Sequence, residues 1–182
     1  MISHNIKKYR HSPLLNEAIE VTNDLGSVTF IGAAAVFLHT NKDRGSQDLD
    51  FIIDYDATDE QLQEKRYIKY NDRRNGYTTK RKTIFVDIYK NTNADISGIP
   101  TKTIINTAER FEINAKRGRI NELKAANLEV LIVMKYNARR NQDIEDLETL
   151  ASYSRRKIDW NQIKSITNDD YHYSRIRALM HI

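Results

Sequence analysis

The sequence predicts an α+β fold, in which a short mixed β-sheet with flanking helices precedes a C-terminal helical layer. In the first half, short β-branched and aromatic runs alternate with segments rich in helix formers. After Asn127 the apolar residues recur at the spacing of amphipathic helices. We therefore expect an α/β core over residues 1–115 and a mainly helical subdomain over residues 116–182.

The composition limits the class of protein. A chain of 182 residues is long enough to bury a substantial core as one domain. Because it contains no cysteine, disulfides, thiolate metal sites and a cysteine nucleophile are excluded. The N-terminus does not resemble a signal peptide, and the longest uncharged apolar stretch, residues 28–39, is too short to span a bilayer. We expect a soluble cytoplasmic protein with no membrane partner, whose net charge of +4 permits contact with nucleic acid without requiring it.

Helix and strand signals alternate through the first half of the chain. Ser12-Pro13 is a typical helix start and Gly26 a typical helix end. In chain order we expect a helix over 12–25, a strand over 28–31, a buried helix over 32–38, a strand over 48–53, a short polar helix over 58–65 and a strand over 83–89. Asn75-Gly76 is a favoured turn pair, so residues 67–70 and 77–79 are expected to form a hairpin.

The second half is expected to be mainly helical. We predict a helix over 101–114 and one edge strand over 119–123. Beyond residue 127, three apolar faces at helical spacing predict a helical layer. They comprise Leu128, Leu131, Val133, Met134 and Ala138, then Ile144, Leu147, Leu150 and Ala151, then Trp160, Ile163 and Ile166. No Gly/Ser linker separates the halves, so we expect them to pack tightly.

An acidic site interrupts this basic chain. Six acids and no Lys or Arg lie between residues 48 and 60. Asp48 and Asp50 are two apart on a predicted strand, so both carboxylates project to one face, where they repel each other unless a cation lies between them. Mg²⁺ binds such carboxylates together with substrate phosphate oxygens. An Asp-x-Asp pattern is also common on the solvent face of an ordinary amphipathic strand.

Two further residues give this acidic pair a context. Asp87 lies in the middle of another apolar strand, where a charge is costly unless it is paired, bound to metal or exposed. If the two strands are neighbours, Asp87 joins Asp48 and Asp50, and such a triad can hold two metal ions that bracket an in-line attack at phosphorus. Gly32 lies at a predicted strand-to-helix turn, whose backbone N–H groups and helix dipole can hold a phosphate.

Three segments together resemble the DNA polymerase β-like nucleotidyltransferase superfamily. The first, Phe30-Ile31-Gly32-Ala33-Ala34-Ala35, looks like its glycine turn. The second, Arg44-Gly45-Ser46-Gln47-Asp48-Leu49-Asp50-Phe51, looks like its Arg-x-Ser/Thr-x-Asp-hydrophobic-Asp strand. The third, Val86-Asp87-Ile88, looks like the strand that carries its third acid. Residues 131–147 contain Lys135, then Ala and Arg, then an Asp-x-x-Asp that starts at Asp143. This segment is similar to the helical motif of small bacterial and archaeal members, which include antibiotic nucleotidyltransferases and the toxins of AbiE-type toxin–antitoxin systems.

The resemblance implies transfer of a nucleoside monophosphate from an NTP to an acceptor hydroxyl. It implies Asp48, Asp50 and Asp87 as catalytic acids and as ligands of Mg²⁺ or Mn²⁺, with Asp87 also activating the hydroxyl. The residues that it implies on the nucleotide side are Gly32, Ala33, Arg44, Ser46, Lys135 and Asp143. The toxin-like relatives imply an RNA or tRNA acceptor and a cognate antitoxin, and a small-molecule acceptor is the next subtype.

The residues of the helical motif also have simpler interpretations. Lys135 has apolar neighbours along which its side chain could extend. Four charged residues have the spacing of surface ion pairs, namely Arg139, Arg140, Asp143 and Asp146.

Ala33 departs from the superfamily pattern, in which serine or glycine follows the turn glycine. A serine hydroxyl that would bind phosphate is therefore missing, and the contact would depend on backbone N–H groups. Ala33 favours an alternative function, a catalytically degenerate module that binds nucleic acid or a protein partner, whereas Asp48, Asp50, Asp87 and Lys135 favour an enzyme. A third interpretation, a basic α+β RNA-binding protein without a nucleotide site, requires the acidic cluster to be incidental.

A basic segment follows the acidic one. Residues 65–82 contain eight Lys or Arg and a single acid, interleaved with three tyrosines. Basic and aromatic residues on a hairpin can guide a nucleic acid through phosphate contacts and base stacking. The candidate contacts are Lys69, Arg73, Arg74, Lys80 and Arg81. The same composition also fits a solvated hairpin with amphipathic tyrosines.

Overall fold

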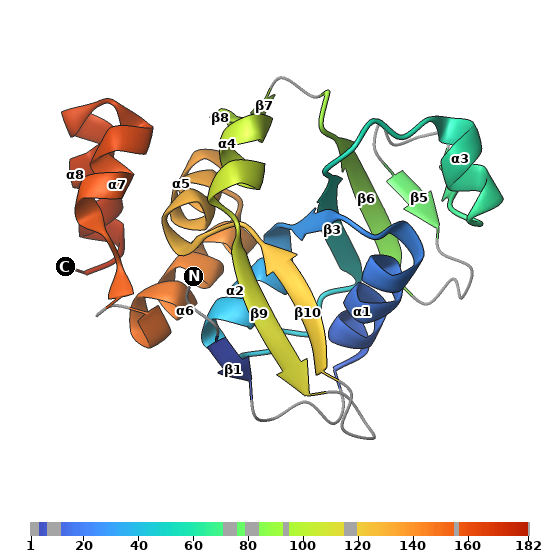
Figure 1. Cartoon of the computed structure of the whole chain (residues 1–182). Coiled ribbons are helices and arrows are strands. Elements are labelled where there is room, and N and C mark those ends of the chain that lie inside the picture. The colour runs from blue at the N-terminus through green and yellow to red at the C-terminus, as the bar shows by residue number, and fades with distance from the viewer. Residues whose placement is uncertain are drawn as a thin grey trace.

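The computed structural model describes residues 4–6, 12–70, 76–78, 84–92, 95–114, 120–154 and 157–181. Eight of the described strands form one mixed sheet in the order β1-β9-β10-β2-β3-β6-β5-β4 (Figure 1). The strands of this sheet are β1 (His4–Ile6), β2 (Val28–Phe30), β3 (Asp48–Ile53), β4 (Ile68–Lys69), β5 (Gly76–Thr78), β6 (Phe85–Lys90), β9 (Glu109–Asn114) and β10 (Ile120–Ala125). A separate hairpin pairs β7 (Asp95–Ile96) with β8 (Ile99–Pro100). The predicted α+β class is confirmed.

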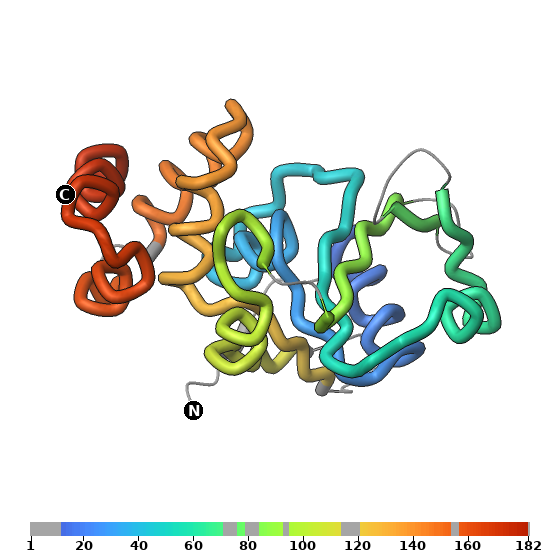
Figure 2. The backbone as a smooth tube through the Cα atoms, turned by 90° about the horizontal axis from the view of Figure 1, so that it is seen from above, coloured from blue at the N-terminus to red at the C-terminus, as the bar shows by residue number. Residues whose placement is uncertain are grey.

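Helices cover the sheet and extend beyond it. They are α1 (Pro13–Leu25), α2 (Gly32–Thr40), α3 (Asp59–Glu64), α4 (Thr101–Thr107), α5 (Leu128–Ala138), α6 (Asn141–Ser154), α7 (Trp160–Thr167) and α8 (Asp170–Leu179). Helix α1 contacts β3 and β10, whereas α2 contacts β3 and also α5 and α6. Helix α7 packs on α5 and on α8, so that α7 and α8 lie at the opposite end of the molecule from α3 (Figure 2). The predicted C-terminal helical layer is thus confirmed.

The part of the fold that positions the acidic residues consists of β2, β3, β6 and α2. Strand β2 is antiparallel to β3, and β3 is parallel to β6. Apolar and aromatic side chains fill these strands, and the buried rings of Phe30 and Phe51 meet edge to face with centroids 5.9 Å apart. Helix α2 is buried along almost its whole length, as its apolar sequence predicts. The expected elements from residue 12 to residue 65, and the strand at 83–89, are confirmed to within two residues at each end.

The helix predicted over residues 101–114 is wrong in its second part. Helix α4 ends at Thr107, and β9 follows as a strand. In β9 the buried side chains of Phe111 and Ile113 alternate with Arg110 and Glu112, a period of two that belongs to a strand. Pairing with β10 over its full length decides the conformation, because tertiary contacts override weak local helix propensity.

The strand predicted over residues 119–123 exists, but it is not an edge strand. Strand β10 lies inside the sheet, antiparallel to β9 and parallel to β2, and its Leu123 and Ala125 are fully buried. The edge position beside β9 is occupied by β1, which the sequence analysis did not predict, and the β7–β8 hairpin was also not predicted. The division proposed near residue 115 falls between β9 and β10, which pair within one sheet, and it stays a prediction.

The strand pairing expected in the basic segment is present. Strands β4 and β5 are antiparallel, and the Tyr70 amide donates to the Gly76 carbonyl at 2.8 Å. Gly76 is the first residue of β5 and pairs with Asp87, whereas Asn75, the other residue of the expected turn, lies outside the described residues. Among the helices described for this chain, none is long and apolar enough to cross a membrane.

Candidate active site

The three candidate catalytic acids lie on two neighbouring strands. Asp48 and Asp50 belong to β3 and Asp87 to β6, and the parallel register sets Asp50 directly beside Asp87 and Asp48 beside Phe85. Paired positions on neighbouring strands share one face of a sheet, and positions two apart share it as well. All three carboxylates therefore project from the same face, and each residue is half-buried. This is the convergence that the sequence predicts if the two strands are neighbours.

Gly32 approaches the same face at the start of α2. Its φ of +60° lies in the left-handed region that glycine adopts readily. The Asp50 carboxylate fills the space where a side chain would begin, because a Cβ at Gly32 would lie 2.9 Å from the Asp50 Cγ. The amide of Ile31 donates to the Asp50 carbonyl at 3.0 Å, which fixes the turn to β3. The glycine turn and the first acid pair therefore form one site.

The electrostatic environment of Asp50 is unfavourable for a lone carboxylate. Burial, together with the neighbouring carboxylates of Asp87 and Asp48, raises its pKa to about 6. The positive charges of Lys135 and Arg140 act in the opposite direction and lower the pKa of Asp50. A bound cation would favour the ionised form of these acids, since it would offset their mutual repulsion.

The carboxylates on this face are oxygen ligands of the kind that Mg²⁺ and Mn²⁺ bind, although they do not form a preformed metal site. Within the described residues, no group of three or more His, Asp or Glu side chains is placed so that together they could hold a metal ion. Mg²⁺ uses one or two carboxylates and completes its shell with water and substrate phosphate oxygens. The adjacent carboxylates of Asp50 and Asp87, with Asp48 on the same face, supply oxygen ligands of that kind.

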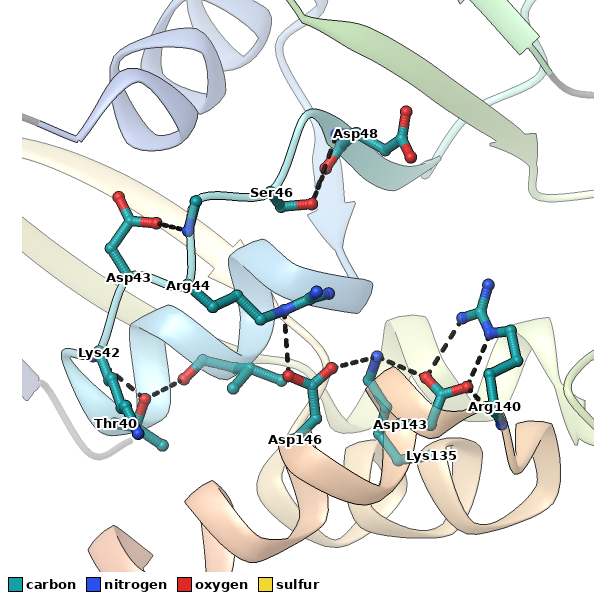
Figure 3. Close-up of polar contacts among 12 residues, drawn as sticks. Thr40, Lys42, Asp43, Arg44, Ser46, Asp48, Lys135, Arg140, Asp143 and Asp146 are labelled. Carbon is teal, nitrogen blue, oxygen red and sulfur yellow. Dashed lines mark hydrogen bonds and ion pairs between the residues drawn. The ribbon is translucent and has the colours of Figure 1, made fainter.

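Lys135 is held between two carboxylates of the next helix (Figure 3). Its Nζ lies 2.9 Å from the Asp143 Oδ1 and 2.7 Å from the Asp146 Oδ2. All three residues are buried, with at most 5% of each exposed. Lys135 therefore does not simply extend along apolar neighbours, because its charge is paired where α5 meets α6. A buried pair of this kind fixes geometry, since removing one partner leaves an uncompensated charge.

Asp146 extends this network to the loop before β3. Its Oδ1 lies 3.0 Å from the Arg44 Nε, so one carboxylate joins Arg44 to Lys135 (Figure 3). Ser46 contacts the backbone of the same loop, donating from Oγ to the Asp48 carbonyl at 3.1 Å. Arg44 and Ser46 thus have structural contacts that fix the entry to β3.

Asp143 forms a second ion pair, with Arg140. Although burial acts to raise its pKa, hydrogen bonds from Arg140 and Lys135 lower the pKa of Asp143 to about 2. The Arg140 Nε lies 2.7 Å from the Asp143 Oδ2, and 70% of the Arg140 side chain is exposed. The expected ion pair at i,i+3 spacing is present, but its acid is buried rather than on the surface. Arg139 instead lies over the Tyr136 ring, 4.7 Å from its centroid.

Sequence reasoning did not place four residues at this site. Asp146 was noted as part of the helical motif and, like Arg140, interpreted as a surface charge. Tyr70 was considered for base stacking in the basic segment, but neither it nor Phe85 was connected with the acids. Phe85 precedes Asp87 by two positions on β6, and this alternation was the available signal.

Among the candidate nucleic-acid contacts, Lys69 is exposed and paired with Asp59 at 3.0 Å. The other four, Arg73, Arg74, Lys80 and Arg81, lie outside the described residues.

Comparison with known proteins agrees with the superfamily resemblance at a coarse level. Residues 12–176 match the family described as nucleotidyl transferase of unknown function (DUF2204). No curated protein matches the sequence. Among solved structures, JHP933 from Helicobacter pylori is similar at 15% identity and a TM-score of 0.46, with 92% of this chain and 88% of that chain covered.

Proposed function

Because the chain belongs to this nucleotidyl transferase family of unknown function, DUF2204, we propose that it transfers a nucleoside monophosphate from an NTP to an acceptor hydroxyl. The observation that carries the proposal is the register of β3 and β6, which sets Asp50 beside Asp87 on the face that Gly32 approaches. Phosphoryl transfer needs positioned acids and a phosphate cradle more than it needs covalent chemistry from the protein. These requirements match the groups that converge here.

The triphosphate would bind at the Gly32 turn. The first backbone N–H groups of α2 have no partner within the helix, and no described side chain caps them. These N–H groups and the helix dipole favour an anion, even though Ala33 brings no hydroxyl. Lys135 and Arg140, which both act on Asp50, would add positive charge on this side of the site. Asp143 and Asp146 would hold Lys135 in position.

Asp48, Asp50 and Asp87 would hold Mg²⁺ or Mn²⁺, which supplies charge neutralisation at the phosphate oxygens when bound. In the transfer, the acceptor oxygen forms a bond to the α-phosphorus while the bond to the bridging oxygen breaks. Pyrophosphate leaves with the electron pair of that bond. Asp87 would accept the proton of the attacking hydroxyl, and its position beside Asp50 supports this role.

We further propose a cytoplasmic RNA, such as tRNA, as the acceptor, and a toxin role with a cognate antitoxin as partner. The support is the resemblance of residues 131–147 to the helical motif of toxin-like transferases and the basic segment over residues 65–82. A small molecule with a free hydroxyl is the competing acceptor. Transfer of labelled nucleotide to total RNA, compared with transfer to small hydroxyl compounds, distinguishes the two.

Thermal unfolding with each of the four NTPs, with and without Mg²⁺ or Mn²⁺, tests the proposal. A ligand that binds only the folded state at a hundred times its Kd stabilises the protein by about 2.7 kcal/mol, which is a measurable shift. We expect a metal-dependent shift with at least one NTP in the wild type and in Asp56→Asn, whose exposed acid is the matched control, but not in Asp50→Asn. No shift in the wild type with any NTP would contradict the proposal.

The alternative is a degenerate module that keeps the fold and binds nucleic acid or a protein partner. Ala33 is the observation that favours it, because the first turn of α2 offers only backbone groups. In a nucleic-acid binder the Asp50 carboxylate would only repel phosphates, so Asp50→Asn would bind RNA as well as the wild type or better. In an enzyme the same substitution removes transfer.

A further inference from the structure

An apolar pocket lies beside Asp87, on the opposite side from Gly32. Its volume is about 150 Å³, and its lining residues are Tyr70, Gly76, Tyr77, Phe85, Val86 and Asp87. The strand order explains its place, since Gly32 contacts Asp50 on β3, Asp87 follows on β6, and the pocket is formed between β6 and the β4–β5 hairpin. The acids therefore separate the glycine turn from this pocket.

Two exposed aromatic rings form the pocket wall. The rings of Tyr70 and Phe85 meet edge to face, with centroids 5.6 Å apart and an interplanar angle of 77°. Tyr70 is 44% exposed and Phe85 is 45% exposed, so both rings offer surface to a ligand. Phe85 and Asp87 project from the same face of β6 because they are two positions apart. A ring that stacks here lies next to the Asp87 carboxylate.

Gly76 and Tyr77 determine the shape and polarity of the pocket. Gly76 pairs with Asp87 in the register of β5 and β6, and because it has no side chain it leaves space beside that carboxylate. The Tyr77 hydroxyl is directed away, since it donates to the Asp59 Oδ1 at 3.1 Å. The pocket therefore presents mainly aromatic and aliphatic surface, with the Asp87 carboxylate and the Tyr70 hydroxyl as polar groups.

We infer that this pocket binds a nucleobase of the acceptor, stacked on Tyr70 and Phe85, so that the hydroxyl of the same nucleotide reaches Asp87. The inference rests on the proposed function and identifies the acceptor class as single-stranded RNA. A cavity of about 150 Å³ accommodates one flat aromatic ring system rather than a whole nucleotide. Stacking on aromatic side chains is also the usual means by which proteins bind unpaired bases without regard to sequence.

The amino-acid composition of the segment that contributes three lining residues, and the polarity of the pocket, favour this ligand over a sugar-like acceptor. Tyr70, Gly76 and Tyr77 belong to the segment over residues 65–82, with eight Lys or Arg against one acid, a composition suited to a phosphate backbone. A polyhydroxyl acceptor would need several hydrogen-bonding groups in its pocket. The lining offers two such side-chain groups, the Asp87 carboxylate and the Tyr70 hydroxyl, while the Tyr77 hydroxyl is engaged with Asp59.

Fluorescence anisotropy with the full chain tests the inference without catalysis. The probe is a short single-stranded RNA labelled at its 5′ end, compared with the same strand carrying an abasic 3′-terminal ribose. We expect the wild type to bind the intact strand roughly 5- to 150-fold more tightly, the range typical of one stacked base. Tyr70→Ala and Phe85→Leu should lose that preference, whereas Phe85→Tyr keeps a ring and should retain it. Tyr153→Ala, which removes an exposed tyrosine on α6, is the matched control.

Equal affinity of the wild type for the two strands would overturn the inference, as would a preference that persists in both Tyr70→Ala and Phe85→Leu. Thermal shift with NTP and metal on the same proteins separates the two proposals. A shift that is present in Tyr70→Ala together with a lost base preference supports both. Base preference in the wild type without any NTP-dependent thermal shift supports the pocket inference and contradicts nucleotidyl transfer. An NTP-dependent shift without base preference supports nucleotidyl transfer and contradicts the pocket inference.

Discussion

The carboxylate of Asp50 lies so close to the backbone of Gly32 that a side chain at residue 32 would overlap it. A Cβ there would lie 2.9 Å from the Asp50 Cγ and 3.1 Å from its Cβ. The residue that turns the chain into α2 is thereby in contact with the acid that pairs with Asp87 on the neighbouring strand. A change at Gly32 is therefore transmitted to the acidic face.

Gly32→Ala tests this contact. The alanine must adopt a φ near +60°, which costs about 1–2 kcal/mol for a residue with a Cβ, and the Asp50 side chain must rotate away. Gly26→Ala is the matched control, because its φ is +77° and nothing lies within 4 Å of an added Cβ. We expect urea unfolding to show a loss of stability in both variants. The NTP- and metal-dependent thermal shift should disappear in Gly32→Ala alone, and an unchanged shift there would contradict a site built on this contact.

The raised pKa of Asp50 predicts an unusual pH dependence of stability. Burial and the neighbouring carboxylates raise the pKa to about 6 in the folded state, against 3.8 for an unperturbed aspartate. Between these values the folded state binds more protons than the unfolded state, so the free energy of unfolding falls as the pH rises from about 4 to about 6. Asp50→Asn should remove this loss and be about 1–3 kcal/mol more stable than the wild type above pH 7 without metal.

Thermal unfolding in EDTA from pH 4 to pH 8 measures this effect. Asp56→Asn, which changes an exposed acid of the same segment, should follow the wild-type profile. If Asp50→Asn shows the wild-type decline over the same range, Asp50 does not carry the excess proton.

Lys135→Met tests the buried network at the junction of α5 and α6. The substitution keeps an apolar side chain of similar length but leaves Asp143 and Asp146 without their shared cation. Removal of one partner from a buried ion pair typically costs about 3–5 kcal/mol, and we expect urea unfolding to show a loss of this size. Lys164→Met is the control, because its pair with Asp170 is exposed on both sides and such pairs contribute little to stability.

A double variant shows whether the loss of stability in Lys135→Met comes from carboxylates that have lost their cation. Adding Asp146→Asn to Lys135→Met removes one of the two carboxylates that have lost Lys135 as a partner, so the combined loss should be smaller than the sum of the single losses. Additive losses would mean that Lys135 and Asp146 act independently.

The elements that carry the acids could be predicted because their signals are local. The strand at 48–53 is delimited by the polar loop before it and its own alternating pattern, and the strand containing Asp87 is an uninterrupted β-branched and aromatic run. The sequence analysis could only say that the acids converge if these two strands are neighbours. In the structure β3 and β6 are indeed neighbours and run parallel. The superfamily resemblance pointed to the same three acids, and their catalytic role stays a prediction.

The features that escaped prediction depend on contacts between distant segments. Strand β9 has weak helix signals that pairing with β10 overrides, and β10 is interior because β1 and β9 lie outside it. Lys135 has acids at i+8 and i+11 on another helix, a spacing that no single-helix pattern reveals. Tyr70 reaches Phe85 only because the β4–β5 hairpin folds against β6.

Asp59 holds the β4–β5 hairpin against β6. Its removal should therefore weaken base binding in the pocket without weakening NTP binding. Its carboxylate accepts from Lys69 on β4 at 3.0 Å, from Tyr77 on β5 at 3.1 Å and from Lys90 on β6 at 2.9 Å. Hydrogen bonds from Lys90 and Lys69 lower the pKa of Asp59 to about 2. This stabilisation is therefore complete above about pH 4 and is lost as the pH falls through 2.

Asp59→Asn should unfold at a slightly lower temperature at pH 7, by an amount typical of exposed ion pairs, because 44% of the Asp59 side chain is exposed. We expect it to weaken the preference for RNA with an intact 3′ base, since the Tyr77 ring and the hairpin lose their common anchor. The NTP- and metal-dependent shift should remain, because Asp59 does not contact Gly32 or the acids of β3 and β6 in the described structure. Asp56→Asn serves as the control, and loss of the NTP shift together with base preference would show that the hairpin supports the whole site rather than the acceptor pocket alone.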